Sequence, residues 1–147
     1  MRTWNGPVIA ILLGACGVLL VTGCVPGVPQ LEGAEREAVL AYAEPATDNL
    51  LAGLEAGDYA QFSRDMSPEM LAAMTESQFS ALRATLEDKV GAYVSRQVTG
   101  VEEGDDFIAV NYDARYEDEE HVSMRVVFDQ DRQISGLWLD SPKLRQQ

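Results

Sequence analysis

The sequence predicts an α+β fold in which N-terminal helices pack on one face of a curved antiparallel sheet. Apolar residues recur at spacings of three and four between residues 34 and 90, which is typical of amphipathic helices. From residue 92 to residue 139 apolar and polar residues alternate, which is typical of strands with one buried face. Because short turns separate successive strands, we expect an antiparallel sheet with the helices on its concave face.

The first predicted helix spans residues 34–56. Pro45 lies inside it and is expected to kink or divide it, because proline removes a backbone donor. Gly57 supplies the stop signal. The apolar positions that carry the helical pattern are Ala38, Val39, Tyr42, Ala46, Leu50, Leu51 and Leu54.

Three further helical segments carry start signals of different kinds. Asp58 is an N-cap for a short helix, and Ser67-Pro68 places proline at the first position of the next one. Thr75-Glu76-Ser77-Gln78 matches the capping box and opens a longer helix. Gly91 ends the helical half of the chain.

The strand half begins at residue 92 and continues through three alternating segments. These segments cover residues 108–116, 122–128 and 134–139. Turn-forming residues separate them at positions 103–106, 117–120 and 129–132. The pattern predicts a meander of consecutive antiparallel strands.

The first 23 residues form a predicted signal peptide. Arg2 precedes an uncharged run over residues 8–23, which is shorter than the about 20 residues that a membrane-spanning helix needs. Cleavage is therefore favoured, and an uncleaved signal anchor is the alternative. Val21-Thr22-Gly23-Cys24 resembles the lipobox of prokaryotic lipoproteins, which implies that Cys24 carries a lipid such as palmitate and becomes the first mature residue. Leu13-Gly14-Ala15-Cys16 also fits, but its use would leave an apolar stub.

The chain is thus expected to be an extracytoplasmic protein held at the cell membrane by a lipid. We expect a signal peptide over residues 1–23, a Pro- and Gly-containing tether over 24–33, one α+β domain over 34–142 and a tail over 143–147. The formal net charge is −13, and the few basic residues are scattered. This composition argues against nucleic acid as a partner and against electrostatic attraction to anionic headgroups.

Five short motifs in the predicted domain resemble one known family. They are residues 52–62, Ser67-Pro68-Glu69-Met70, Gly91-Ala92-Tyr93, Val126-Val127-Phe128-Asp129 and Ile134-Ser135-Gly136-Leu137. Over about residues 38–140 the chain is similar to domain-of-unknown-function family 3887, of the nuclear-transport-factor-two-like superfamily. The resemblance implies a cone-shaped α+β fold with a pocket between sheet and helices. It implies no activity, because that superfamily includes enzymes, ligand binders and association modules.

Neither a metal nor another cofactor is assigned. His121 is the only histidine, and the carboxylates at residues 117–120 belong to a predicted turn, where charged groups are usually solvated. Asp129-Gln130-Asp131 begins like a calcium loop, but Ile134 stands where such a loop needs glycine.

We predict a noncatalytic binding or association module, with a small acid/base enzyme acting on an organic molecule as the alternative. The enzyme would use Asp113 with Tyr112 or Tyr116. Because Asp113 and Tyr112 are adjacent in a strand, only one of them can face the interior. A buried carboxylate with a raised pKa beside an open cavity would favour the enzyme. The side chains assigned as candidates to line the pocket between sheet and helices are Phe62, Phe79, Tyr112, Met124, Phe128 and Trp138.

A homodimer formed through the outer face of the sheet is also expected. Several apolar residues are assigned to that face, leaving a patch that a monomer rarely exposes. Arg115 and Arg125 on the same face could pair with acidic residues of a second copy. The apolar residues assigned to it are Phe107, Ala109, Val127, Leu137 and Leu139.

Overall fold

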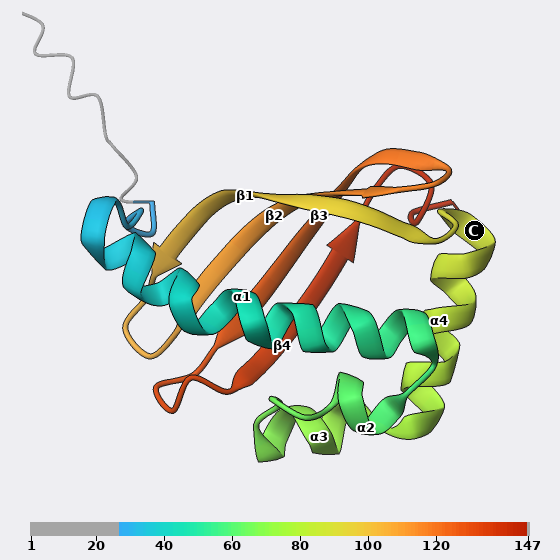
Figure 1. The fold of residues 1–147 in the computed structure, drawn as a ribbon, viewed down its shortest axis with the longest axis horizontal. Helices are drawn as coiled ribbons and strands as arrows, with labels where there is room; N and C mark the ends of the chain where they lie inside the picture. Colours follow the sequence, from blue (N-terminus) through green and yellow to red (C-terminus); the bar gives the residue numbers. More distant parts are fainter. Residues whose placement is uncertain (1–26, 147) are drawn as a thin grey trace, which may run out of the picture.

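The computed structural model describes residues 27–146, and these form helices followed by a four-stranded antiparallel sheet (Figure 1). The helices are α1 (Gly33–Ala56), α2 (Tyr59–Phe62), α3 (Pro68–Ala73) and α4 (Glu76–Lys89). The strands are β1 (Tyr93–Glu103), β2 (Ile108–Tyr116), β3 (Glu119–Phe128) and β4 (Ile134–Asp140), in the sheet order β1-β2-β3-β4. The predicted α+β class is confirmed.

The predicted signal peptide and Cys24 lie outside the described residues. Within residues 27–146, no helix is long and apolar enough to cross a membrane.

α1 is one continuous helix, so Pro45 does not divide it. Buried residues such as Val39 and Leu50 lie on both sides of the proline and pack into the core. This packing offsets the missing backbone hydrogen bond, because most helical stability in proteins comes from tertiary contacts. The helix ends where Gly57 adopts a φ of 68° and donates its N–H to the carbonyl of Gly53.

The shorter helices begin at the caps that the sequence predicts. The side chains of Asp58 and Ser67 each accept a hydrogen bond from the backbone N–H three residues further on, at 3.1 and 3.2 Å. Thr75 and Gln78 form the reciprocal capping box at the start of α4. These caps fix the residue at which each of the three helices begins.

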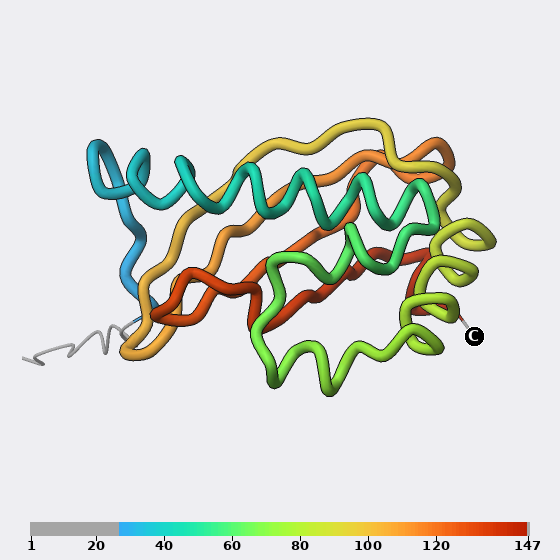
Figure 2. Tube along the Cα trace, turned by 60° about the horizontal axis from the view of Figure 1, so that its bottom comes forward, coloured from blue at the N-terminus to red at the C-terminus, as the bar shows by residue number. Residues whose placement is uncertain are grey.

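The helices cover one face of the sheet (Figure 2). α1 runs across that face, and α4 stands at the end where β1 begins. The strand pairing contains register shifts, including those between Val98 and Gly100 in β1 and between Val127 and Phe128 in β3. Such bulges bend strands and increase their twist, which gives the sheet the curvature that wraps it around α1.

Side chains fill the space between α1 and the sheet. Alternating positions of β2 and β3 point toward the helices and are mostly almost fully buried, whereas the intervening positions, apart from the buried Ala109, are polar or partly exposed. The largest fully buried side chains are Tyr112, Tyr116, Phe62, Phe128, Leu50, Met124 and Ile134. The interior is therefore packed along most of its length.

The segment before α1 is bound to the free edge of β1. Leu31 donates its N–H to the carbonyl of Val101 at 2.7 Å, and Glu103 donates to the carbonyl of Pro29 at 3.1 Å. Gln30 and Glu102 form the corresponding antiparallel bridge. The chain therefore enters the domain at the C-terminal end of β1.

Candidate functional site

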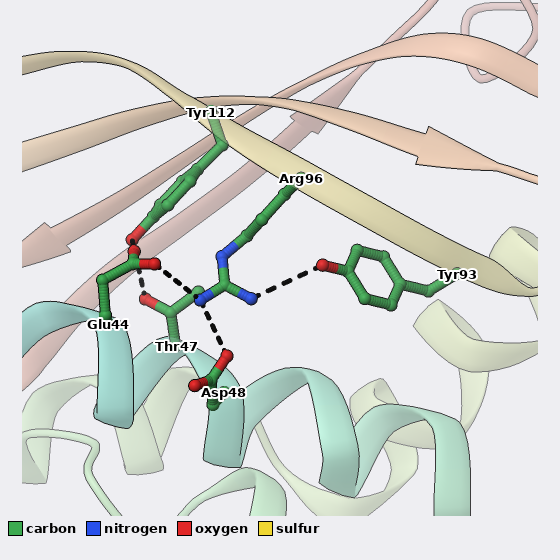
Figure 3. Close-up of polar contacts among 6 residues, drawn as sticks. All are labelled: Glu44, Thr47, Asp48, Tyr93, Arg96 and Tyr112. Atoms are coloured by element: carbon green, nitrogen blue, oxygen red, sulfur yellow. Dashed lines mark hydrogen bonds and ion pairs between the residues drawn. The ribbon is translucent and has the colours of Figure 1, made fainter.

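A largely buried arginine joins β1 to α1 (Figure 3). Nη2 of Arg96 lies 2.8 Å from Oδ1 of Asp48 and 3.2 Å from Oε2 of Glu44, and the arginine side chain is 11% exposed. Burial alone would lower the pKa of Arg96, but its hydrogen bonds with Tyr93 and Asp48 and the charge of Glu44 raise it overall. Arg96 therefore stays charged and holds α1 against β1.

Tyr112 of β2 completes this network. Its hydroxyl donates to Oε1 of Glu44 at 2.7 Å and lies 3.2 Å from Oγ1 of Thr47, which is fully buried. Its ring stands beside the guanidinium of Arg96, with Cζ 5.2 Å from the ring centroid. Burial raises the pKa of Tyr112, the hydrogen bond with Thr47 partly offsets this, and Glu44 raises the pKa further. Because both oxygens of Glu44 have partners, we interpret this network as a structural clamp.

An open pocket of about 370 Å³ lies next to the clamp, between α1, α4 and the turn that joins β2 to β3. Tyr93 belongs to both features, because its hydroxyl accepts a hydrogen bond from Nη1 of Arg96 at 3.4 Å and its side chain lines the pocket. Apolar lining is provided by the buried Leu54 and Leu86. The other lining residues are Glu55, Arg83, Glu87, Gly91, Ala92, Tyr116, Glu117 and Asp118.

Tyr116 places an unsatisfied hydroxyl at this pocket. The residue is 2% exposed, and its Oη has no hydrogen-bond partner among residues 27–146. Its ring meets that of Tyr93 edge to face, with centroids 5.7 Å apart. Burial, followed by the neighbouring Tyr93 and Glu55, raises the pKa of Tyr116 to about 12. The hydroxyl therefore stays neutral near pH 7 and can both donate and accept a hydrogen bond.

The rim of the pocket is acidic. Glu55, Glu87, Glu117 and Asp118 line it, and none of them forms an ion pair with another residue of the described range 27–146. Arg83 is the basic lining residue. Its Nε donates to the carbonyl of Leu54 at 3.1 Å and its Nη2 to that of Glu55 at 3.5 Å, so it caps the C-terminus of α1.

Backbone hydrogen bonds hold the rim in place. The turn after α4 contains Gly91 at a φ of 79°, and a Cβ there would lie 3.1 Å from Oδ2 of Asp118. Asp118 donates its N–H to the carbonyl of Val90, and Glu117 donates to that of Ala92, both at 2.9 Å. The turn between β2 and β3 is thereby fixed against the start of β1.

Most of the side chains predicted to line the interior lie in the packed core. Phe62, Phe79, Tyr112, Met124 and Phe128 are each at most 3% exposed, and none of them lines the pocket between α1, α4 and the β2–β3 turn. Tyr112, Met124 and Trp138 do line a second pocket of about 390 Å³, which lies beside Arg125 and Asn111. Trp138 differs from expectation, because it is 58% exposed and pairs with Arg125 on the outer face of the sheet. The register places its neighbours Leu137 and Leu139 toward the core instead.

The outer face of the sheet is therefore less apolar than the sequence suggested. Leu137 and Leu139, which the sequence pattern assigns to this face, pack against the core instead. Arg125 is engaged within the chain: its Nη1 lies 2.7 Å from Oε2 of Glu102 and donates to Oδ1 of Asn111 at 2.8 Å. Its guanidinium is therefore already paired within the chain, whereas we expected it to pair with acidic residues of a second copy.

Asp113 is also on this outer face, away from the pocket. Its Oδ2 lies 2.9 Å from Nδ1 of His121. The hydrogen bond with Asp113, and then its charge, raise the pKa of His121. Asp113 and the tyrosines at positions 112 and 116 thus do not form a common acid/base site. Among residues 27–146, no group of three or more His, Cys, Asp and Glu side chains could hold a metal ion.

Sequence reasoning missed most of the pocket. The sequence suggests Tyr116 only as a partner for Asp113, and it gives no role to Tyr93, Glu55 or Glu87. The pocket draws on the end of α1, the face of α4, the start of β1 and the end of β2, and no sequence spacing links these four segments. The one available signal was Gly91-Ala92-Tyr93, which formed part of the family resemblance.

The fold and the site together define a small α+β domain with an open pocket that has an acidic rim. The chain belongs to the family described as "Protein of unknown function (DUF3887)", which matches residues 47–137. No curated protein gives a significant match.

One similar solved structure is described as "AclR a putative hydroxylase from Streptomyces galilaeus". It is 12% identical, the match covers 71% of this chain and 83% of that one, and the TM-score is 0.41. A similarity this low carries no argument about the function of the present chain.

Proposed function

We propose that this protein is an extracytoplasmic, lipid-anchored binding module that holds a small organic ligand in the pocket between α1, α4 and the β2–β3 turn. The observation that carries the proposal is the hydroxyl of Tyr116, which is buried at an open pocket and has no partner among residues 27–146. A buried polar group without a partner is costly, so a ligand that bonds to it gains affinity.

Binding without catalysis is favoured over the acid/base chemistry that the sequence suggested, because the carboxylates that contact Tyr112 or follow it in β2 are already engaged. Glu44 binds both Arg96 and Tyr112, and Asp113 binds His121 on the other face of the sheet. Two carboxyl groups outside the pocket, those of Glu102 and Asp140, have lowered pKa values. At Glu102, burial opposes the shift but is outweighed by bonds from Arg125 and Asn111, and at Asp140 the bond from Arg145 lowers the pKa. A general acid at neutral pH needs the opposite shift.

The attachment of residues 29–31 to β1 bears on where the pocket would lie relative to the lipid anchor. The lipid on Cys24 would be joined to Pro29 by five residue steps, which span at most about 17 Å. The pocket lies at the Tyr93 end of β1, and the tether attaches at the Glu103 end. Because strands rise about 3.3 Å per residue, this 11-residue strand separates the two by about 30 Å. The pocket would then lie at the end of β1 that is far from the tether.

The anchor is tested by labelling with an acyl-chain analogue in a prokaryotic host. The full chain should incorporate the label and enter the detergent phase, and Cys24→Ser should abolish both. Cys16→Ser is the matched control and should behave like the parent protein. Equal labelling of the Cys24→Ser variant would refute the anchor.

Binding is tested by adding a mixture of small neutral, anionic and cationic organic molecules to the isotope-labelled chain. We expect changes in the amide signals of Gly91 and Glu117 while the added molecules remain chemically unchanged. Ala92→Trp should block these changes, and Ala84→Trp on the exposed face of α4 should not. Conversion of an added molecule by the parent chain, blocked in Ala92→Trp and kept in Ala84→Trp, would instead favour the enzyme.

A further inference from the structure

Resting on this proposed binding function, we propose that the ligand is a small organic cation, namely a protonated amine attached to a short apolar body. The pocket combines an acidic rim, aromatic rings, an apolar floor and a free hydroxyl acceptor. Each of these features matches one part of such a molecule. An anion of the same size would match the apolar floor and could accept a bond from the hydroxyl, but the acidic rim would repel it.

The charge around the pocket is one-sided. The four rim carboxylates have no cationic partner among the described residues, and the nearest basic side chains are bound to carbonyl oxygens. Arg83 donates to Leu54 and Glu55, and Lys143 donates to the carbonyl of Asp118. A cation in the pocket would therefore meet unpaired carboxylates, whereas an anion would have to displace existing bonds of Arg83.

The acidic rim alone would not define a site, and Tyr116 supplies the independent observation. Its Oη is buried, has no partner among residues 27–146 and belongs to a residue that lines the pocket. Neighbouring groups cover this oxygen, and an ammonium group that displaces them can donate one N–H to it. The neighbouring rings of Tyr93 and Tyr116 add the attraction of an aromatic face for a cation.

The apolar floor determines the rest of the ligand. Leu54 and Leu86 are 5% and 4% exposed and line the pocket beside the tyrosines. A volume of about 370 Å³ lies at the lower end of the range for small-molecule sites. A compact aromatic or aliphatic amine fits this combination better than a polyamine, which has no apolar body to bury.

The test compares three probes of nearly equal size with the full chain in a nonionic detergent: 2-phenylethylamine, 2-phenylethanol and 3-phenylpropionate. Calorimetric titration should show the amine binding at least about tenfold more tightly than the anion, and its affinity should fall with added salt. Tyr116→Phe should weaken amine binding about tenfold, which is the value of one ordinary hydrogen bond. Glu55→Gln and Glu117→Gln should each weaken it about two- to fivefold. Glu37→Gln, near the other end of α1, is the matched control and should have no effect.

The outcomes separate this inference from the proposal on which it rests. If the alcohol or the anion binds as tightly as the amine and Ala92→Trp blocks that binding, the pocket is a binding site but its ligand is not a cation. If the amine binds equally well to the parent, Tyr116→Phe and Glu55→Gln chains, the assignment of these groups is wrong. If none of the three probes binds, the cation inference and the proposed pocket function both fail.

Discussion

Replacing Tyr112 and Tyr116 by Phe, one at a time, should separate a hydroxyl that stabilises the fold from one that is available to a ligand. Both residues lie on β2, point toward the helices and are 2% exposed. They differ in their partners, because the Tyr112 hydroxyl contacts Glu44 and Thr47 whereas that of Tyr116 has no partner within residues 27–146. The aromatic rings are unchanged by the substitution, so packing is nearly constant.

The expected energies follow from these contacts. Tyr112→Phe removes a hydrogen bond to a carboxylate and leaves the buried Thr47 without that partner, which should cost about 2–3 kcal/mol. At about 4 °C per kcal/mol for a domain of this size, the melting temperature should fall by about 8–12 °C. Tyr116→Phe removes a hydroxyl that gains nothing in the ligand-free state. Its melting temperature should therefore stay the same or rise by a few degrees.

Thermal unfolding followed by circular dichroism measures both changes under the same conditions. Tyr59→Phe provides an intermediate reference, because its hydroxyl donates to one backbone carbonyl, that of Met74, at 2.8 Å. A loss of stability in Tyr116→Phe as large as that in Tyr112→Phe would refute the reasoning. It would mean that the Tyr116 hydroxyl is satisfied within the protein and is not available to a ligand.

Three further outcomes are expected. Phe128→Ala should cost about 3–5 kcal/mol in chemical unfolding, because Phe128 is fully buried, and an unchanged midpoint would mean that the inward face is misassigned. In a proton NMR titration the single imidazole, His121, should have a pKa above its ordinary value, and Asp113→Asn should lower that pKa. The Asp113–His121 pair stabilises the fold below the unfolded pKa of about 6.5, and this stabilisation is lost as the pH rises through the folded pKa. Sedimentation at high micromolar concentration in low salt should show a dimer that Trp138→Ser weakens, and a monomeric parent protein would leave the expected homodimer without support.

Local signals in the sequence were sufficient for the helices. Asp58, Ser67 and Thr75 cap helices as predicted, because capping depends on a side chain and a backbone N–H only three residues away. Pro45 is the exception, since its effect depends on tertiary packing. Buried residues on both sides of it keep α1 continuous, and no local rule includes that contribution.

The misplacement of Trp138 has a specific cause in β4. Phe128 pairs with Ile134, but Val127 pairs with Gly136, so the register shifts by one residue between these pairs. A shift of one residue moves every following side chain to the opposite face. Simple alternation from Ile134 therefore assigned Trp138 to the interior, and only the pairing with β3 reveals the change.

The pocket could not be predicted because its residues become neighbours only when the chain folds. Tyr116 and Tyr93 meet through the antiparallel pairing of β2 with β1, and Glu55 and Glu87 come from two different helices. Their chemical types are common on protein surfaces. What distinguishes Tyr116 is the absence of a hydrogen-bond partner among the described residues, and that property exists only in the folded structure.

The most direct test of the binding site is to locate 2-phenylethylamine on the full chain by intermolecular nuclear Overhauser effects. The account predicts contacts from the methylene group next to the nitrogen to the ring protons of Tyr116 and Tyr93, and contacts from the phenyl ring to the methyl groups of Leu54 and Leu86. Contacts to Trp138 on the outer face of the sheet, with none to Tyr116, would contradict it.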